Sequence, residues 1–316
     1  MSGRPVIAID VGGTTMKGAL VDAAGGLACV ERRPTNREEG GDVVVDRILA
    51  FARDLLDRAR EQHGETDVRA VGLGVPGLVD EANGMAVSAV NLGWDRIPLA
   101  RLVRDSTGLP AVLGHDVRLA GLAEGRLGAA AGSMDYLFIA LGTGIGAAAV
   151  LRGQAYTGSH GVGGEFGHMV VDPEGPPCAC GKRGCVEALS SAGAIERRYA
   201  ALCPGARDVS ARDVAALVNA GNLQATQVWD EAVAALGRAI ANYAILLDPE
   251  LVVIGGGLAS AGATLFEPLG DTVAGAILFE PGPRIEPAGL GDDAGCIGAG
   301  LNAWITPGVQ SEAPCN

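Results

Sequence analysis

The sequence predicts an α/β protein of two lobes, each of which opens with a β-hairpin that turns on glycines. Each opening consists of an apolar strand, a glycine-rich turn and a returning strand. These elements are 5–10, 12–13 and 14–22 in the first half, and 135–141, 142–146 and 147–151 in the second half. No low-complexity linker divides the two halves. The recurrence therefore favours two similar α/β lobes.

The rest of the first half alternates between helices and strands. Apolar residues recur at helical spacing from Val44 to Leu55, which predicts an amphipathic helix over 42–62. The other predicted elements are strands at 26–33, 69–75 and 109–114, and helices at 99–107 and 117–128. Residues 77–94 are predicted to be a loop with a short strand.

The second half adds several helices and one clear strand. The strand is 250–254, an apolar run that ends in three glycines, and the predicted helices are 190–201, 210–220, 223–247 and 294–304. The tail from Thr306 is polar and contains Pro307 and Pro314, so we expect it to be disordered.

The composition limits the possible partners. The chain has 316 residues, is 48% hydrophobic but only 4% aromatic, and carries a net charge of −13. Because nucleic acids and anionic membranes attract basic surfaces, we expect neither as a partner. No apolar run reaches the roughly 18–20 residues that a membrane span requires.

Cysteine usage indicates a reducing compartment. Four of the seven cysteines are scattered without the spacing of a disulfide framework: Cys29, Cys203, Cys296 and Cys315. The first residues lack the basic and apolar regions of a signal peptide. We therefore expect a cytoplasmic protein.

Residues 165–187 have the composition of a metal-binding loop. Cys178, Cys180 and Cys185 form C-x-C-x4-C, and His168 lies upstream of them in a stretch rich in glycine and proline. Three thiolates and one imidazole complete a tetrahedral shell, which is typical of a closed structural zinc site. The alternative is a loop of reduced cysteines without a metal. We expect zinc.

Two carboxylates flank these ligands. Glu165 precedes His168 by three residues, and Glu187 follows Cys185 by two. Carboxylates held by a rigid metal loop can accept charge-assisted hydrogen bonds from neighbouring hydroxyls, so a polyhydroxylated ligand is expected. The alternative is that both are solvated loop charges.

Three glycine-rich turns follow strands, at 10–17, 141–146 and 254–258. In the first two, a strand, a glycine turn and a second strand present backbone N–H groups and a threonine hydroxyl to one side, which predicts a phosphate cradle. The G-x4-G-K-[ST] pattern of a Walker loop is absent from the sequence.

The motifs D-V-G-G-T-x-x-K, L-G-T-G-x-G, E-F-G-H, C-x-C-G-x-x-G-C-x-E and V-I-G-G-G stand in this order along the chain. With this set the chain resembles the ROK family (repressors, open reading frames, kinases) over nearly its whole length. The resemblance implies a two-lobed actin-like ATPase fold, also called ribonuclease H-like, with the zinc loop in the larger lobe. It implies a smaller lobe of 1–115 plus about 295–316 and a larger lobe of 116–294 with the zinc loop and the nucleotide and sugar contacts, the active site lying in the cleft between the two.

The family places its catalytic base in an N-D-A-N motif, where this chain has His115-Asp116-Val117-Arg118. The resemblance implies that Asp116 accepts the proton of the sugar hydroxyl; from the sequence alone it could equally cap the following helix. The implied sugar contacts are Asn91, His115, Asp116, Glu165, His168 and Glu187. A turn-forming role is the alternative for Asn91, and the replaced asparagines weaken any inference about sugar preference.

The resemblance also implies a nucleotide site. Its residues are Asp10, Gly12, Gly13, Thr14, Lys17, Gly142, Thr143, Gly144, Gly256 and Gly257. Asp10 would orient Mg²⁺ through water, and the last two glycines would lie against adenosine; a solvated strand charge is the alternative for Lys17. Zinc is expected to be structural, because His168, Cys178, Cys180 and Cys185 fill its four positions.

The expected activity is therefore transfer of the γ-phosphoryl of ATP, bound with Mg²⁺, to the 6-hydroxyl of an aldohexose, with glucose favoured. The closest alternative is a kinase of N-acetylglucosamine or N-acetylmannosamine, for which Gly163-Gly164 would leave room beside Glu165. A polyphosphate donor and a sugar sensor without catalysis are further alternatives. A repressor is not expected, because Asp10 leaves no space ahead of it for a DNA-binding domain. We expect a homodimer or homotetramer.

Overall fold

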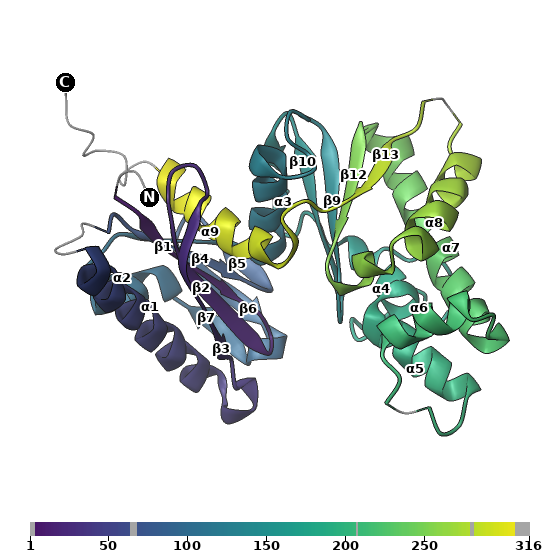
Figure 1. Ribbon diagram of the computed structural model, residues 1–316, viewed down its shortest axis with the longest axis horizontal. Helices are drawn as coiled ribbons and strands as arrows, with labels where there is room; N and C mark the ends of the chain where they lie inside the picture. The colour runs from purple at the N-terminus through teal and green to yellow at the C-terminus, as the bar shows by residue number, and fades with distance from the viewer. Residues whose placement is uncertain (1–3, 64–67, 207, 279–280, 307–316) are drawn as a thin grey trace. The chain divides into compact units, whose positions relative to one another are not determined.

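The computed structural model describes residues 4–63, 68–206, 208–278 and 281–306. The disorder predicted for the tail falls on 307–316, outside these residues. The chain forms two compact units (Figure 1). Unit 1 comprises Met1–Ala123, Gly158–Val162 and Asp292–Asn316, and unit 2 comprises Glu124–Thr157 and Gly163–Gly291. The first boundary between these units falls within a helix, α3 (Asp116–Leu127); the lobe boundary that the family resemblance implies, between 115 and 116, stays a prediction.

Unit 1 is built on a five-stranded sheet in the order β3-β2-β1-β4-β8. The strands are β1 (Val6–Val11), β2 (Thr15–Val21), β3 (Leu27–Pro34), β4 (Val71–Val75) and β8 (Ala111–His115). The predicted hairpin forms, because β1 pairs antiparallel with β2. Strands β1, β4 and β8 are parallel, so their carboxyl ends lie at one edge of the sheet.

Helices cover both faces of this sheet, so its central strands are apolar on both sides. On one face, Ile7 and Ile9 belong to a core shared with α1 (Gly41–His63) and α2 (Leu99–Thr107). On the other face, Ala8 belongs to a smaller core shared with α9 (Ala294–Ile305). A Cβ on Gly72 of β4 would lie only 1.9 Å from the Ala299 carbonyl oxygen. The glycine therefore permits the close approach of α9.

A second sheet of unit 1 occupies the region predicted to be mostly loop. It has three strands, β5 (Leu78–Asp80), β6 (Met85–Ala89) and β7 (Trp94–Ile97), which pair antiparallel. These strands are too short to give a clear alternation of apolar and polar residues. The short 3₁₀ helix η2 (Val90–Leu92) joins the last two.

Unit 2 repeats the arrangement of the larger sheet. Its strands are β9 (Tyr136–Leu141), β10 (Ile145–Leu151), β11 (Gln154–Ala155), β12 (Leu251–Gly255) and β13 (Arg284–Pro287), in the order β11-β10-β9-β12-β13. Again an antiparallel hairpin, β9 with β10, is followed by strands parallel to the first, β12 and β13. The prediction of two similar lobes is confirmed at the level of strand order.

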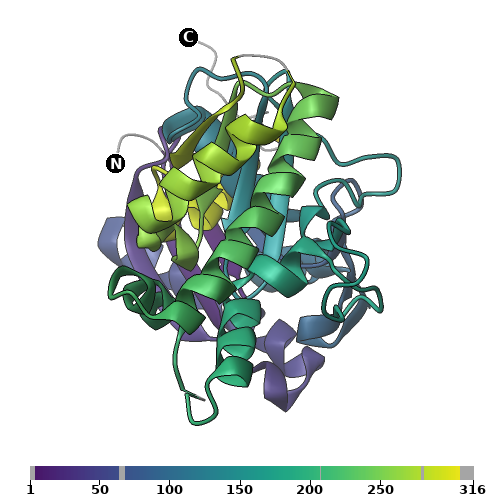
Figure 2. The same cartoon turned by 90° about the vertical axis from the view of Figure 1, so that its right-hand side faces the viewer.

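The helices of unit 2 pack a large core against this sheet (Figure 2). They are α4 (Val186–Ser190), α5 (Ala192–Leu202), α6 (Ala211–Asn219), α7 (Leu223–Leu247) and α8 (Ala263–Ala276). The sequence did not predict α8, because Pro268 and two glycines interrupt its helical pattern. It also did not predict β13, which is short and partly charged. Among the described helices of the chain, none is long and apolar enough to cross a membrane.

Candidate active site and metal centre

The carboxyl ends of the parallel strands in unit 1 bring together the two aspartates singled out from the sequence. Asp10 stands near the end of β1, and Asp116 follows β8 directly. A Cβ on Gly74, near the end of the intervening β4, would lie 3.4 Å from Asp10 Oδ1 and 3.6 Å from Asp116 Cα. Ligand sites in α/β proteins typically form at this edge of a sheet.

Asp116 is the first residue of helix α3. Its Oδ1 accepts the Val117 N–H at 2.7 Å and lies 3.3 Å from His115 Nδ1. The His115 ring is mostly buried, and its Nδ1 also lies 3.4 Å from the Arg118 backbone nitrogen, which donates to it. The position of the Asp116 carboxylate is thus fixed by its own helix and by the preceding residue.

Asp10 is held in an environment that opposes its ionisation. Burial, and secondarily the negative charge of Asp116, raise its pKa to about 7, although Lys17 acts in the opposite direction. A Cβ on Gly295 at the start of α9 would lie 2.4 Å from Asp10 Oδ2, so the carboxylate packs directly on this glycine. A cation bound beside the two aspartates would relieve the repulsion between them.

The first glycine turn is closed by backbone and by Thr35. Gly12 N–H donates to the Thr15 carbonyl at 3.0 Å, and the buried Thr35 hydroxyl donates to the Gly12 carbonyl at 2.8 Å. A Cβ on Gly13 would lie 3.5 Å from nitrogen atoms of both Arg37 and Asn91. Asn91 thus lies beside the first glycine turn. Arg37, which sequence reasoning missed, brings a positive charge there.

Lys17 is not a solvated charge, contrary to the alternative considered for it. Its side chain is buried on β2, where Nζ pairs with Asp293 and donates to the Asp292 carbonyl at 3.1 Å. Burial, and then Arg32, lower its pKa. Its partners lie in the 3₁₀ helix η5 (Gly291–Asp293), which precedes α9. Lys17 therefore ties the first hairpin to the segment that leads into α9.

The second glycine turn, in unit 2, is contacted by the start of two helices. The Ile145 N–H at its end donates to Glu187 Oε2 of α4 at 2.9 Å, and a Cβ on Gly144 would lie 2.7 Å from the same oxygen. The N–H of Ala192, the first residue of α5, donates to the Gly142 carbonyl at 2.9 Å. Glu187 is therefore a partner of the turn rather than a solvated charge.

The third glycine segment lies beside the second. Gly256 adopts φ +84°, and a Cβ there would lie 2.3 Å from the Leu141 carbonyl oxygen at the end of β9. A pocket of about 200 Å³ opens between α6 and the 3₁₀ helix η4 (Gly257–Ala261). Gly257, Arg212 and Asn219 contribute to its lining. Unit 2 thus holds two glycine segments that follow the neighbouring parallel strands β9 and β12, and a pocket at the second segment.

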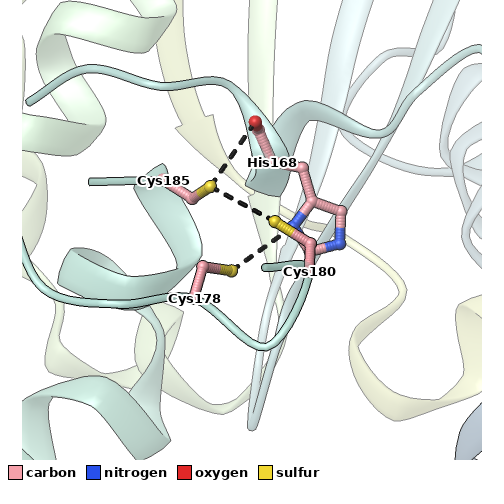
Figure 3. Close-up of side chains that lie close together, drawn as sticks. All are labelled: His168, Cys178, Cys180 and Cys185. Carbon is pink, nitrogen blue, oxygen red and sulfur yellow. Dashed lines mark hydrogen bonds between the residues drawn. The ribbon is translucent and has the colours of Figure 1, made fainter. Parts of the chain in front are cut away.

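The four predicted metal ligands converge (Figure 3). Their ligand atoms all lie within 4.8 Å of one another, with Cys178 Sγ 3.7 Å from His168 Nδ1 and Cys180 Sγ 3.6 Å from Cys185 Sγ. The loop reverses on Gly181 and Gly184, both at positive φ, and a Cβ on Gly184 would overlap the Asp172 carbonyl. This donor set could hold a metal ion, as expected from its spacing.

The two glycines before Glu165 allow neighbouring backbone segments to approach closely. A Cβ on Gly163 would lie 2.5 Å from the Tyr156 carbonyl oxygen, and one on Gly164 would lie 2.2 Å from that of Ala147. Gly164 also has a φ of +98°. Chain packing therefore accounts for both glycines, which give no support to a space for an acetamido group.

The chain matches the ROK family over residues 6–305. It belongs to the ROK family. It is 38% identical to the glucokinase of Halalkalibacterium halodurans, with 96% of each chain covered. It is 33% identical to the N-acetylmannosamine kinase of Citrobacter koseri, with 94% of this chain and 98% of the relative covered. A crystal structure of the ROK glucokinase from Streptomyces griseus, in complex with glucose and AMPPNP, has a TM-score of 0.81 and 29% identity over 94% of this chain and 98% of its own. The predicted actin-like ATPase fold is confirmed.

In this ROK protein, Glu165 stands beside the cluster of His168 and the three cysteines. Its Oε2 lies 3.8 Å from His168 Nε2, whereas Nδ1 of the same ring faces Cys178. A carboxylate near the outer nitrogen of a ligating histidine typically orients the ring. Glu165 itself is exposed, so its carboxylate is also accessible to a ligand.

Sequence reasoning missed the side chains that hold the segment around Asp116. The buried Arg118 forms an ion pair with the exposed Glu81 next to His115 and Asp116. Arg118 was noted only as a departure from the family motif. No local signal reveals the pairing, because the two residues lie 37 positions apart.

Proposed function

We propose that this ROK protein is an ATP-dependent hexose kinase, which transfers the γ-phosphoryl of ATP to the 6-hydroxyl of an aldohexose, with glucose favoured. The observation that carries the proposal is the placement of Asp10 and Asp116 together at the carboxyl ends of parallel strands, next to a glycine turn. The glucokinase from H. halodurans, related over 96% of its length, supports the choice of sugar.

In the proposed reaction Asp116 is the general base. The 6-hydroxyl oxygen forms a bond to the γ-phosphorus while the bond between that phosphorus and the β,γ-bridging oxygen breaks, leaving ADP. The hydroxyl proton passes to the Asp116 carboxylate. Contacts with Val117 and His115 hold this carboxylate in place, which favours positioned proton transfer.

The three glycine segments and Asp10 are proposed to receive the nucleotide. Gly12, Gly13 and Thr14 would face phosphate in unit 1, and Gly142, Thr143 and Gly144 would do so in unit 2. Gly256 and Gly257 would lie against adenosine, for which the pocket beside η4 offers space. Mg²⁺ bound with ATP would neutralise phosphate charge, and Asp10 would orient it through water. Lys17 acts at most indirectly in this proposal, because Asp293 already neutralises it.

The sugar is proposed to contact Asn91, His115, Glu165, His168 and Glu187, besides Asp116. Glu165 and His168 combine an exposed carboxylate with a ring nitrogen that faces away from Cys178. Both groups accept or donate hydrogen bonds at fixed positions, as recognition of ring hydroxyls requires.

The metal of the cysteine cluster is proposed to be structural zinc. A tetrahedral zinc with Zn–S bonds of about 2.3 Å holds its sulfur ligands about 3.8 Å apart, close to the observed spacing of 3.6 Å. The three thiolates and His168 would fill all four positions, so the metal would stabilise the loop and leave no place for a reacting water.

Phosphorylation of an N-acetylhexosamine is the second candidate, and the N-acetylmannosamine kinase from C. koseri favours it. A panel of sugars with ATP and Mg²⁺ tests both proposals: glucose, mannose, N-acetylglucosamine and N-acetylmannosamine. Phosphorus NMR identifies the position of the new phosphate. We expect the highest kcat/KM with glucose and phosphate on the 6-hydroxyl. A preference for an N-acetylhexosamine would select the second candidate, and phosphorylation of none of the sugars would refute both. Assembly as a homodimer or homotetramer stays a prediction, which light scattering measures.

A further inference from the structure

Arg118 is a buried cation at the start of α3. Its side chain is only 4% exposed, although arginine is among the residues most rarely buried. Nε and Nη2 lie 3.1 and 3.0 Å from Glu81 Oε1, and Nη1 donates to the Gly161 carbonyl at 3.2 Å. The planar guanidinium thus holds two separate segments of unit 1 in a fixed geometry.

The first of these segments supports the base. Glu81 follows β5 and also accepts the His115 backbone N–H, at 3.4 Å. Asp116 therefore stands between two residues that the Glu81 carboxylate contacts, His115 and, three positions after it, Arg118. The two departures from the family motif at this place, His115 and Arg118, share one partner.

The second segment is the loop of residues 158–162. The Gly163 N–H donates to the Thr157 carbonyl at 2.8 Å and so joins the two ends of the loop. Within the loop, Gly161 has a φ of +75°, and a Cβ there would lie 3.6 Å from the Val79 carbonyl of β5. The loop therefore packs on β5 and is held by Arg118, and its exit leads within three residues to Glu165.

We propose that Arg118 and Glu81 are positioning residues for the sugar, which act by fixing the 158–162 loop and the segment around Asp116. The inference rests on the proposed function. If the guanidinium is removed, the loop samples more conformations, and only a fraction of molecules presents the arrangement that binds sugar. The apparent affinity falls by that fraction, while a bound sugar reacts as before.

The test compares Arg118→Met, which keeps the apolar stem, with Arg118→Lys and with Arg126→Met. Arg126 lies in the last turn of the same helix and is exposed, so it serves as the matched control. We expect Arg118→Met to raise KM for the sugar about 10-fold, with kcat within about 3-fold and KM for ATP unchanged. The KM of Arg118→Lys for the sugar should lie between those of Arg118→Met and the wild type, because lysine retains the charge but lacks the planar set of donors of the guanidinium. Arg126→Met should match the wild type.

Hydrogen exchange of the 158–164 amides gives a readout that is independent of activity. We expect Arg118→Met to accelerate exchange there, with the Arg126→Met pattern unchanged. Faster exchange without a rise in sugar KM would overturn the positioning role, and so would a fall in kcat at constant KM. Unchanged exchange would show that Arg118 does not hold the loop. If the wild type phosphorylates no sugar, the proposed function fails instead. Hydrogen exchange then still shows whether Arg118 holds the 158–162 loop.

Discussion

At the scale of single residues, the pKa of Asp10 shows how folding changes the ionisation of a carboxyl group. Asp10 is moved from water into a site next to Asp116, so its ionised form is disfavoured. Its pKa of about 7 in the folded protein lies well above the ordinary value of 3.8. Because the folded protein binds this proton more tightly than the unfolded chain, Asp10 lowers stability as the pH rises between these two values.

Asp10→Asn should therefore stabilise the ligand-free protein at high pH. The wild type loses about 1.4 kcal/mol of unfolding free energy per pH unit through Asp10 between pH 4 and 7, and the neutral amide removes this loss. Urea unfolding at pH 5 and pH 8 without Mg²⁺ measures the effect. The advantage of the mutant should be larger at pH 8 by a few kcal/mol. An equal difference at both pH values would contradict the account.

Lys17 and Glu187 show the limit of sequence reasoning at this scale. The sequence singled out Lys17 as a candidate phosphate contact and Glu187 as a candidate sugar contact, but it could not predict their partners within the protein. Lys17 pairs with Asp293, which is 276 positions away, and Glu187 with the Ile145 N–H, 42 positions away. Such contacts depend on how the strands and helices assemble, which no local pattern encodes.

The contact of Glu187 separates its expected role from that of Glu165. Glu165→Gln should raise KM for the sugar about 10-fold or more and leave KM for ATP unchanged, because it loses a charged acceptor for hydroxyls. Glu187→Ala should raise both constants, since it also frees the Ile145 N–H of the second glycine turn, which is proposed to receive phosphate. Steady-state kinetics with each substrate varied in turn will show the difference. Equal effects of the two variants on KM for ATP would mean that the second glycine turn does not depend on Glu187.

At the scale of elements, the sequence predicted the helices and strands that have a clear local pattern and missed those that lack one. The glycine hairpins and long amphipathic helices such as α1 have clear apolar patterns, and the cysteine loop has a distinctive spacing. Helix α8 and strand β13 lack such patterns, because Pro268 and charged residues interrupt them. Their stability comes from packing on α7 and β12, which is a tertiary effect.

Cys180→Ser should release the metal from the cysteine loop and abolish sugar binding. Binding of a structural metal contributes free energy to folding. Without the metal, residues 165–187 should therefore lose their fixed arrangement. Elemental analysis gives the zinc content, and calorimetry gives the affinity for glucose. One zinc per wild-type chain and far less in the mutant are expected. Fully active wild-type protein that contains no zinc would disprove the assignment.

At the scale of the whole molecule, the two units repeat one strand order around their glycine turns. The sequence revealed this duplication because each half begins with the same succession of apolar strand, glycines and returning strand. It also indicated most of the candidate site, because the motifs lie at strand ends, where α/β proteins bind ligands. It did not reveal the ion pair of Glu81 and Arg118, because these two residues come from separate segments of the chain.

The central claim is that Asp116 is the base of a hexose 6-kinase, and Asp116→Asn tests it most directly. Asparagine keeps the shape and the contact with the start of α3 but cannot accept the proton. Glucose 6-phosphate formation from ATP and glucose gives kcat, and calorimetry gives the Kd for glucose. We predict a fall in kcat of at least about 100-fold with Kd within a few-fold of the wild type. Turnover close to that of the wild type would show that another group accepts the proton.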